Sequence, residues 1–124
     1  MKPWRKILSW AQPQKPEEIV EREKNLIDVE AKDEGGGYWS LIGKIDLGFQ
    51  PPHYVAYVRL PEDHPDVGKD ESECNVAVNG GLTYASGTMF GWDYAHGWNV
   101  NTSVNEVLED MKDALWYFRS REAS

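Results

Sequence analysis

The clearest structural signal of the sequence is residues 103–118, SVNEVLEDMKDALWYF. Ser103 and Glu106 have the spacing of a capping box, in which each side chain satisfies a backbone N–H group of the other residue at a helix start. Beyond the box, apolar residues recur with the period of one helix face, at Val104, Val107, Leu108, Met111, Leu115 and Phe118. The stretch therefore predicts an amphipathic helix, which needs a second layer to cover its apolar face.

The residues before this helix predict that the second layer is a β-sheet. Apolar residues fall on odd positions from 39 to 49, with Ser40, Lys44 and Asp46 between them, which is the period of a half-buried strand. Further strands are predicted at 54–60, 75–79, 82–85 and 88–94, with the glycines at 80 and 81 as a hairpin turn. The predicted fold class is α+β, an antiparallel β-meander with the C-terminal helix packed on one face.

The domain is predicted to occupy residues 38–124, after a partly helical N-terminal extension over residues 1–37. A second helix of this extension is predicted from Pro16 onward, although residues 26–29 could equally begin a strand. The three glycines at 35–37 predict a flexible break between extension and domain.

The first eleven residues predict a short amphipathic helix. Its apolar stripe consists of Trp4, Ile7, Leu8 and Ala11, and basic residues lie off that stripe. Together with Trp10, the stripe fits a helix that docks on the domain. It equally fits an arm that contacts another protein, which would give the chain a structural role in an assembly.

Length and charge exclude several classes of protein. A chain of 124 residues supports one core. Cys74 is the single cysteine, and neither a leader-like segment nor an apolar run of membrane-spanning length is present, so we expect a cytoplasmic protein without a membrane part. With 13 basic and 21 acidic side chains, the net charge of -8 disfavours general nucleic-acid binding.

Several short motifs follow one another in the second half of the chain. They are Tyr57-Val58, His64-Pro65, Gly68-Lys69-Asp70, residues 78–84 (VNGGLTY) and residues 91–96 (GWDYAH). With the closing helix, they resemble an uncharacterised family of small phage and prophage proteins. The resemblance implies a protein of the host cell cytosol but no particular activity. This chain has Asn79 where the family usually has His, so an imidazole is missing there, and Trp92 where it usually has Phe.

Two groups of residues have ligands that suit a divalent cation. Asp93 and His96 are three positions apart and could share a metal or act as an acid–base pair, or could instead satisfy backbone groups of a turn. His64 lies in the acidic stretch 62–73, whose candidate ligands are Asp63, Asp66, Asp70, Glu71 and Glu73. The spacing matches no EF-hand loop, and charge runs usually face water, so a solvated acidic loop is favoured over a cation site.

Aromatic residues gather near the last predicted strand. Phe90, Trp92 and Tyr94 alternate and so lie on one side of it, with Tyr84 and Trp98 nearby in sequence. If the C-terminal helix covers that side, the rings are core, which is the expected case. Otherwise they form an exposed platform for stacking on a base or a partner's side chain.

The sequence as a whole favours a binding function. No complete catalytic set is present, and we predict a phage-type accessory protein that binds a basic host protein surface, in a counter-defence role. The binding residues are then the acids of 62–73 together with Glu109, Asp110 and Asp113. Further candidate binding residues are His64, Asn79, Asp93 and His96. The alternative is a small metal-assisted enzyme or ligand-binding protein centred on Asp93 and His96, with His64 added by the fold.

Overall fold

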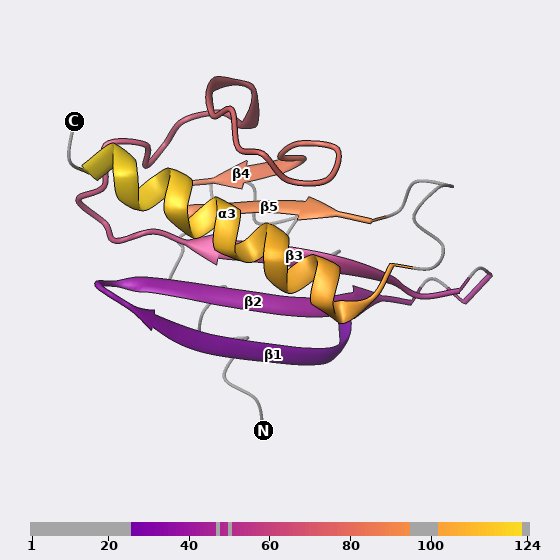
Figure 1. Cartoon of the computed structure of the whole chain (residues 1–124). Helices are drawn as coiled ribbons and strands as arrows, with labels where there is room; N and C mark the ends of the chain where they lie inside the picture. Colours follow the sequence, from indigo (N-terminus) through magenta and orange to yellow (C-terminus); the bar gives the residue numbers. More distant parts are fainter. Residues whose placement is uncertain (1–25, 47, 50, 95–101, 123–124) are drawn as a thin grey trace.

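The computed structural model describes residues 26–46, 48–49, 51–94 and 102–122. These residues form a five-stranded antiparallel sheet with a helix on one face (Figure 1). The elements are β1 (Leu26–Gly35), β2 (Tyr38–Ile45), β3 (His53–Arg59), the 3-10 helix η1 (Glu71–Glu73), β4 (Tyr84–Ser86), β5 (Met89–Asp93) and α3 (Val104–Glu122). The predicted α+β class is confirmed.

The strand order is β1-β2-β3-β5-β4. The first three strands follow one another, residues 60–83 then lead to β4 at the far edge, and β5 returns beside β3. The predicted strand at 75–79 is absent from this sheet, because the chain there contributes Cys74 and Val76 to the core without a strand partner. The glycines at 80 and 81 form a turn in that connection, and the hairpin turn lies at Gly87, where φ is 61°.

The sheet includes β1, which lies on the N-terminal side of the predicted boundary at residue 38. Gly35, Gly36 and Gly37 have φ values of 87°, 65° and 88°, which favour glycine, and they turn the chain from β1 into β2. The glycine run is therefore a hairpin turn, and residues 26–29 begin a strand, as the alternative prediction had it. The predicted helices before Leu26, with the stripe from Trp4 to Ala11, lie outside the described residues.

The main core lies between α3 and the sheet. Val107, Met111, Ala114 and Phe118 of α3 are buried. They pack with strand residues that include Ala56, Val58, Phe90, Trp92 and Tyr94. The interpretation of 90, 92 and 94 as core residues is therefore confirmed, whereas Tyr84 lies in the cluster on the opposite face and Trp98 lies outside the described residues.

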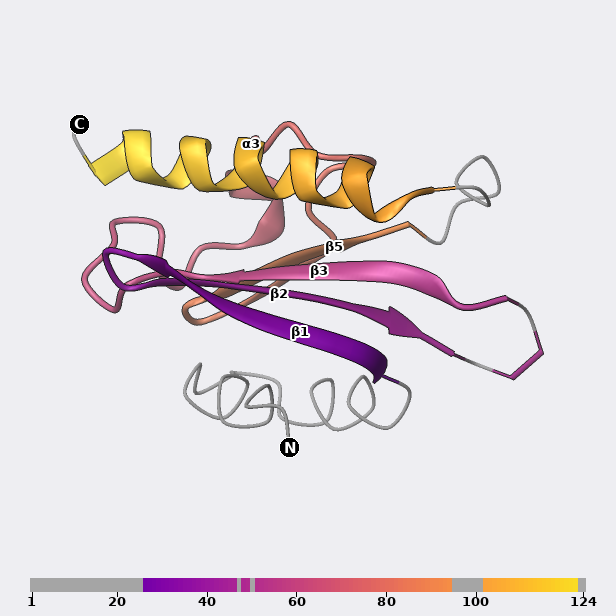
Figure 2. The same ribbon diagram turned by 60° about the horizontal axis from the view of Figure 1, so that its bottom comes forward.

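The opposite face of the sheet is apolar as well. Its buried cluster consists of Val29, Leu41, Ile45, Val55, Tyr57, Tyr84 and Met89. Tyr57 meets Tyr84 edge to face, with ring centroids 5.6 Å apart. Figure 2, which views the sheet nearly edge-on, shows α3 on the other side from these residues. The sheet is thus apolar on both faces.

Candidate binding groove

A groove lies beside α3 because the helix covers only part of the sheet. Its buried side chains pack over β3 and β5, and the outer strands β1 and β2 extend beyond it (Figure 1). Between this uncovered margin and the first half of α3 is a cavity of about 310 Å³. Even-numbered residues of β1 and β2 face it, since alternate side chains of a strand point to the same side.

The floor of the groove is apolar. Ile42 and Tyr54 come from the sheet, and Met111 comes from α3. Val104 and Leu108 border the same cavity and are each 45% exposed. The sequence predicted both in the buried stripe of the helix, and their exposure follows from the sheet margin lying away from the helix there.

The outer wall of the groove is charged and belongs to β1. Asp28, Glu30, Lys32 and Glu34 occupy its even positions. Glu34 accepts a hydrogen bond from Ser40 Oγ at 2.6 Å, and its carboxylate lies 4.0 Å from Lys32 Nζ. Within the described part of the chain, Asp28 and Glu30 form no hydrogen bond or ion pair through their carboxylates. Among the described residues, three carboxylates and two ammonium groups line the cavity, so the charge around it is negative on balance.

Lys44 is a second basic residue of the groove. Its Nζ lies 5.0 Å from the centre of the Tyr54 ring, in the position of a cation–π contact. This contact holds the ammonium group against the floor. The groove therefore presents an acidic wall, an apolar floor and one ammonium group that lies against the floor.

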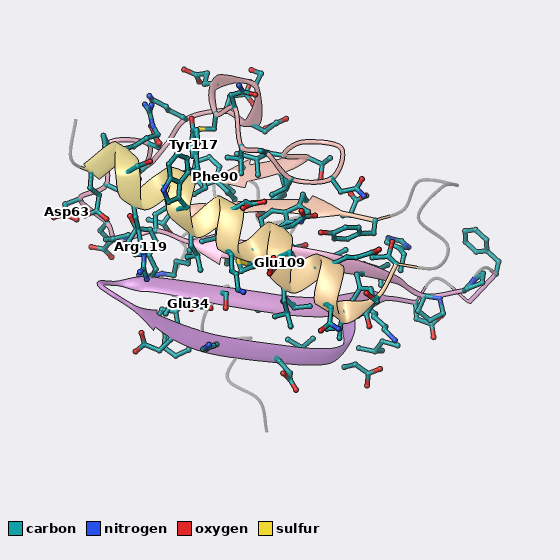
Figure 3. The ribbon with its side chains drawn as sticks, viewed as in Figure 1. Glu34, Asp63, Phe90, Glu109, Tyr117 and Arg119 are labelled. Atoms are coloured by element: carbon teal, nitrogen blue, oxygen red, sulfur yellow. The ribbon has the colours of Figure 1, made fainter. Side chains whose placement is uncertain are left out.

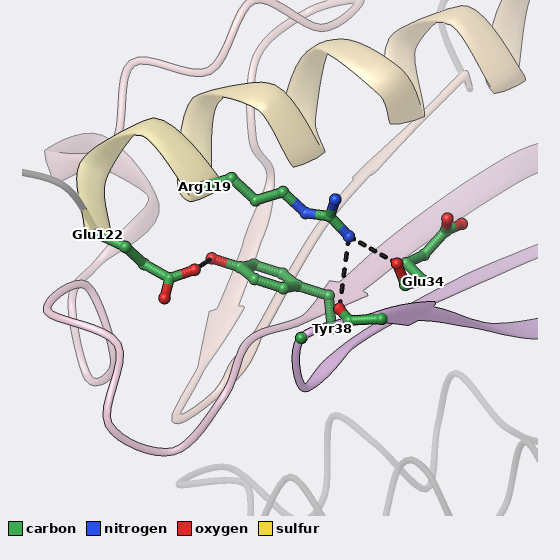
Figure 4. A pocket seen from close by; sticks show the side chains of 6 residues that line it. Glu34, Tyr38, Arg119 and Glu122 are labelled. Carbon is green, nitrogen blue, oxygen red and sulfur yellow. Dashed lines mark hydrogen bonds between the residues drawn. The ribbon is translucent and has the colours of Figure 1, made fainter.

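Beyond one end of the groove, side chains tie α3 to the β1–β2 turn (Figure 4). Arg119 Nη2 donates to the backbone oxygens of Glu34 and Gly35 at 2.6 and 3.4 Å, and its guanidinium lies 5.1 Å from the Tyr38 ring centre. The Tyr38 hydroxyl donates to the Glu122 carboxylate. Burial raises the pKa of Tyr38, and the hydrogen bond to Glu122 raises it further, so the phenol stays protonated. This end is thus fixed by the fold.

Two residues of the predicted acidic site, His64 and Asp66, are buried. His64 Nδ1 accepts from the Asp66 N–H at 2.9 Å, so Nε2 carries the proton and donates to the Phe118 carbonyl at 2.7 Å. Asp66 accepts from Arg121 Nε, and its other carboxylate oxygen lies 3.0 Å from Lys69 Nζ. These contacts anchor the end of α3 to the connection, so both residues serve the fold.

The remaining acids of that stretch are closer to solvent. Asp63, Asp70 and Glu73 are exposed, and Glu71 is half-buried. Glu73 accepts from the Asp70 N–H at 2.9 Å, which holds η1 in place. Figure 3 places Asp63 beyond the C-terminal end of α3, Glu34 beside the helix at the outer strands, and Glu109 along the helix. The acids are therefore spread along α3 and do not form one compact patch.

The other predicted site residues lie apart from this stretch. Asn79 is half-buried, and its backbone N–H donates to Asp110 at 3.3 Å. Asp93 is half-buried at the end of β5 and accepts from Thr83 Oγ1 at 3.2 Å. His96 lies outside the described residues, so the predicted pair of Asp93 and His96 stays a prediction. In the ranges that the structure describes, no three His, Cys, Asp or Glu side chains are grouped to hold a metal ion.

The acidic wall of β1 was missed by the sequence interpretation. Positions 28, 30, 32 and 34 are all charged, and Val29 and Ala31 between them are apolar, which is the period of a strand. That alternation was a usable signal. It was assigned to a helical extension because the glycines that follow suggested a linker.

Comparison with protein-family models, with curated proteins and with solved structures found no match. In the part of the chain that the structure describes, helices lack the length and apolar character needed to cross a bilayer.

Proposed function

We propose that this protein is a binding module for a protein segment that is both basic and apolar, and that the groove between β1 and α3 is its site. The apolar floor suits aliphatic or aromatic side chains, and the wall with Asp28 and Glu30 suits lysine or arginine. The observation that carries the proposal is the pairing of the Asp28 and Glu30 carboxylates with the half-exposed Val104 and Leu108 in one cavity.

The charge of the whole domain supports a basic partner. The described residues carry 17 acidic and seven basic side chains. Such an excess speeds encounter with a positively charged surface and repels acidic ones. The exposed acids Glu109 and Asp113 on α3 add to the field without touching the groove.

The biological setting is an extension of the same proposal. If the resemblance to phage proteins holds, the protein works in the host cytosol, and its acidic charge then favours a basic host protein as the partner. A positively charged nucleic-acid channel of a defence enzyme has the required charge, and occupying it would block the enzyme's substrate. This counter-defence role rests on the resemblance and on the charge of the groove wall.

A titration with two designed peptides tests the proposed site. One peptide alternates leucine and lysine, and the other has glutamate at each lysine position, so apolar content and length are matched. We expect the lysine peptide to shift the NMR signals of Ile42 and Leu108, with an affinity that falls as salt rises. Equal binding of both peptides, or shifts confined to residues outside the groove, would contradict the proposal.

Two charge reversals, one inside the groove and one outside it, separate binding at the groove from attraction by the general acidic field. Glu30→Lys removes an acid of the groove wall, and Asp113→Lys makes the same charge change on an exposed residue outside it. We expect Glu30→Lys to weaken the lysine peptide about tenfold, and Asp113→Lys to weaken it only about twofold. Equal losses would show that net charge, and not the groove, governs binding.

A further inference from the structure

The second face of the sheet is deeply buried. Met89 is 0% exposed, and Leu41, Val55 and Tyr57 are each 1% exposed. The buried cluster to which they belong contains strand residues alone. Side chains on an open sheet face shield one another only from the sides, and a face becomes buried when a second layer packs about 10 Å above it. All five strands contribute apolar residues to this face, and an apolar sheet face is stable in water when such a layer packs on it.

The described helix and connection do not supply that layer. The buried residues of α3 belong to the cluster on the other side of the sheet. The connection between β3 and β4 packs there too, through Leu60, Cys74 and Val76. Figure 2 shows α3 on that side. Within the described residues, no helix or loop covers this face.

We propose that the N-terminal segment supplies the cover, with the stripe of Trp4, Ile7, Leu8 and Ala11 packed on the second face. Residues 1–25 lead directly into β1, an edge strand of the sheet. Residues 95–101 are the other longer stretch outside the described residues, and in sequence they connect Tyr94 to α3. Tyr94 and the buried residues of α3 belong to the core on the helix side of the sheet. The N-terminal segment is thus the long piece of chain available to the second face.

Size and charge agree with this assignment. Five strands about 4.8 Å apart make a face roughly 19 Å wide. An eleven-residue helix is about 16 Å long, so it spans most of that width. A helix this short is marginal in water, and burial of its stripe on the sheet would stabilise it. Lys2, Arg5 and Lys6 lie off the stripe, and they carry charge opposite to that of the acidic domain.

Nuclear Overhauser effects in the full-length chain provide the direct test. With the Met89 methyl group labelled, we expect contacts to the Trp4 indole or to the methyl groups of Ile7 and Leu8. An isotope-filtered experiment on a mixture of labelled and unlabelled chains separates contacts within one molecule from contacts between copies. Absence of contacts to residues 1–25, or contacts only between copies, would overturn the proposal.

A pair of matched variants gives an independent readout. Leu8→Asp places a carboxylate in the stripe, and Ser9→Asp adds the same charge on the other side of the predicted helix. We expect Leu8→Asp to raise the fluorescence of anilinonaphthalene sulfonate several-fold and to shift the Met89 methyl signal, with Ser9→Asp close to the wild type. Equal responses of the two variants would overturn the proposal. If Leu8→Asp does not fold, the contacts of Met89 in the wild-type chain decide the question.

Discussion

The hydroxyl group of Tyr94 donates a hydrogen bond to the carboxylate of Asp110, and so joins the end of β5 to the middle of α3. The same hydroxyl accepts from Trp92 Nε1 at 3.0 Å, and Asp110 also accepts from the Asn79 N–H. Burial raises the pKa of Tyr94, and the hydrogen bond to Asp110 raises it further, so the hydroxyl remains a donor. One carboxylate thus holds strand, connection and helix together.

We predict that Tyr94→Phe lowers the free energy of unfolding by about 1–3 kcal/mol, because the buried Trp92 Nε1 and Asp110 lose a partner. Tyr117→Phe is the matched control. Its hydroxyl accepts from the N–H of the exposed Asn75 at 3.2 Å, where water can replace it, so we expect a loss below about 0.5 kcal/mol. Chemical denaturation measures both variants, and equal losses would contradict the prediction.

Asp66 is expected to make stability depend on pH in the acidic range. Burial opposes its ionisation, but the hydrogen bonds and charges of Arg121 and Lys69 outweigh burial, and the pKa of this carboxyl is lowered from the ordinary 3.8. The ionised Asp66 carboxylate therefore contributes fully to the free energy of unfolding above its unfolded-state pKa, and this contribution is lost as pH falls through its folded-state pKa. At neutral pH, Asp66→Asn is expected to lower the free energy of unfolding by about 1–3 kcal/mol.

The comparison for Asp66 is made with Asp63→Asn, which removes an exposed acid of the same stretch. Denaturation at a series of pH values from neutral to strongly acidic gives the profiles. The difference between wild type and Asp66→Asn should shrink below about pH 4, whereas the profile of Asp63→Asn should follow the wild type. A difference that stays constant with pH would show that ionisation of Asp66 does not stabilise the fold.

Cys74 is expected to be unreactive in the folded protein. Burial raises the pKa of its thiol to about 11, and the nearby Asp66 carboxylate acts in the same direction. Since the thiolate is the reacting form, alkylation by iodoacetamide at mildly alkaline pH should be about a hundredfold slower than for an ordinary cysteine. The chain unfolded in guanidinium chloride is the control. Rates within a few-fold of each other would contradict the burial of this residue.

Gly91 is expected to tolerate no side chain. A Cβ atom placed there would lie 2.6 Å from Tyr57 Cδ1 and 2.9 Å from Tyr57 Cε1. Gly91→Ala should therefore lower the free energy of unfolding by about 1–3 kcal/mol, as overpacking does in other cores. In a Tyr57→Leu background the same change should cost less, because the ring is gone. Additive losses in this double-mutant cycle would exclude the steric explanation.

The helix could be predicted from the sequence because its signals are local. The Glu106 N–H donates to Ser103 Oγ at 3.4 Å, and the Ser103 N–H donates to Glu106 Oε2 at 3.2 Å, as the capping box requires. Strands β2, β3 and β5 were predicted nearly in place because their signals are also local, a period of two for β2 and a run of β-branched and aromatic residues for β3.

The parts that were not predicted depend on contacts between distant residues. Asp66 looked like a solvated acid, because the sequence does not show that Arg121, 55 positions later, reaches it. β1 was assigned to an extension because the glycine run that follows it was interpreted as a flexible break, and only the pairing with β2 shows that this run is a hairpin turn. The groove could not be predicted either, since it exists only where β1 extends the sheet beyond α3.

The two outer edges of the sheet limit how this protein can aggregate. β4 has three residues, and the pairing of β1 slips between Ile27 and Glu30, where Asp28 has a φ of 51°. A strand of another molecule could pair with only three residues of β4, and at the opposite edge it would meet the irregular and charged β1. The fold should therefore resist fibril growth by strand addition, and concentrated solutions should stay clear as long as the native state persists.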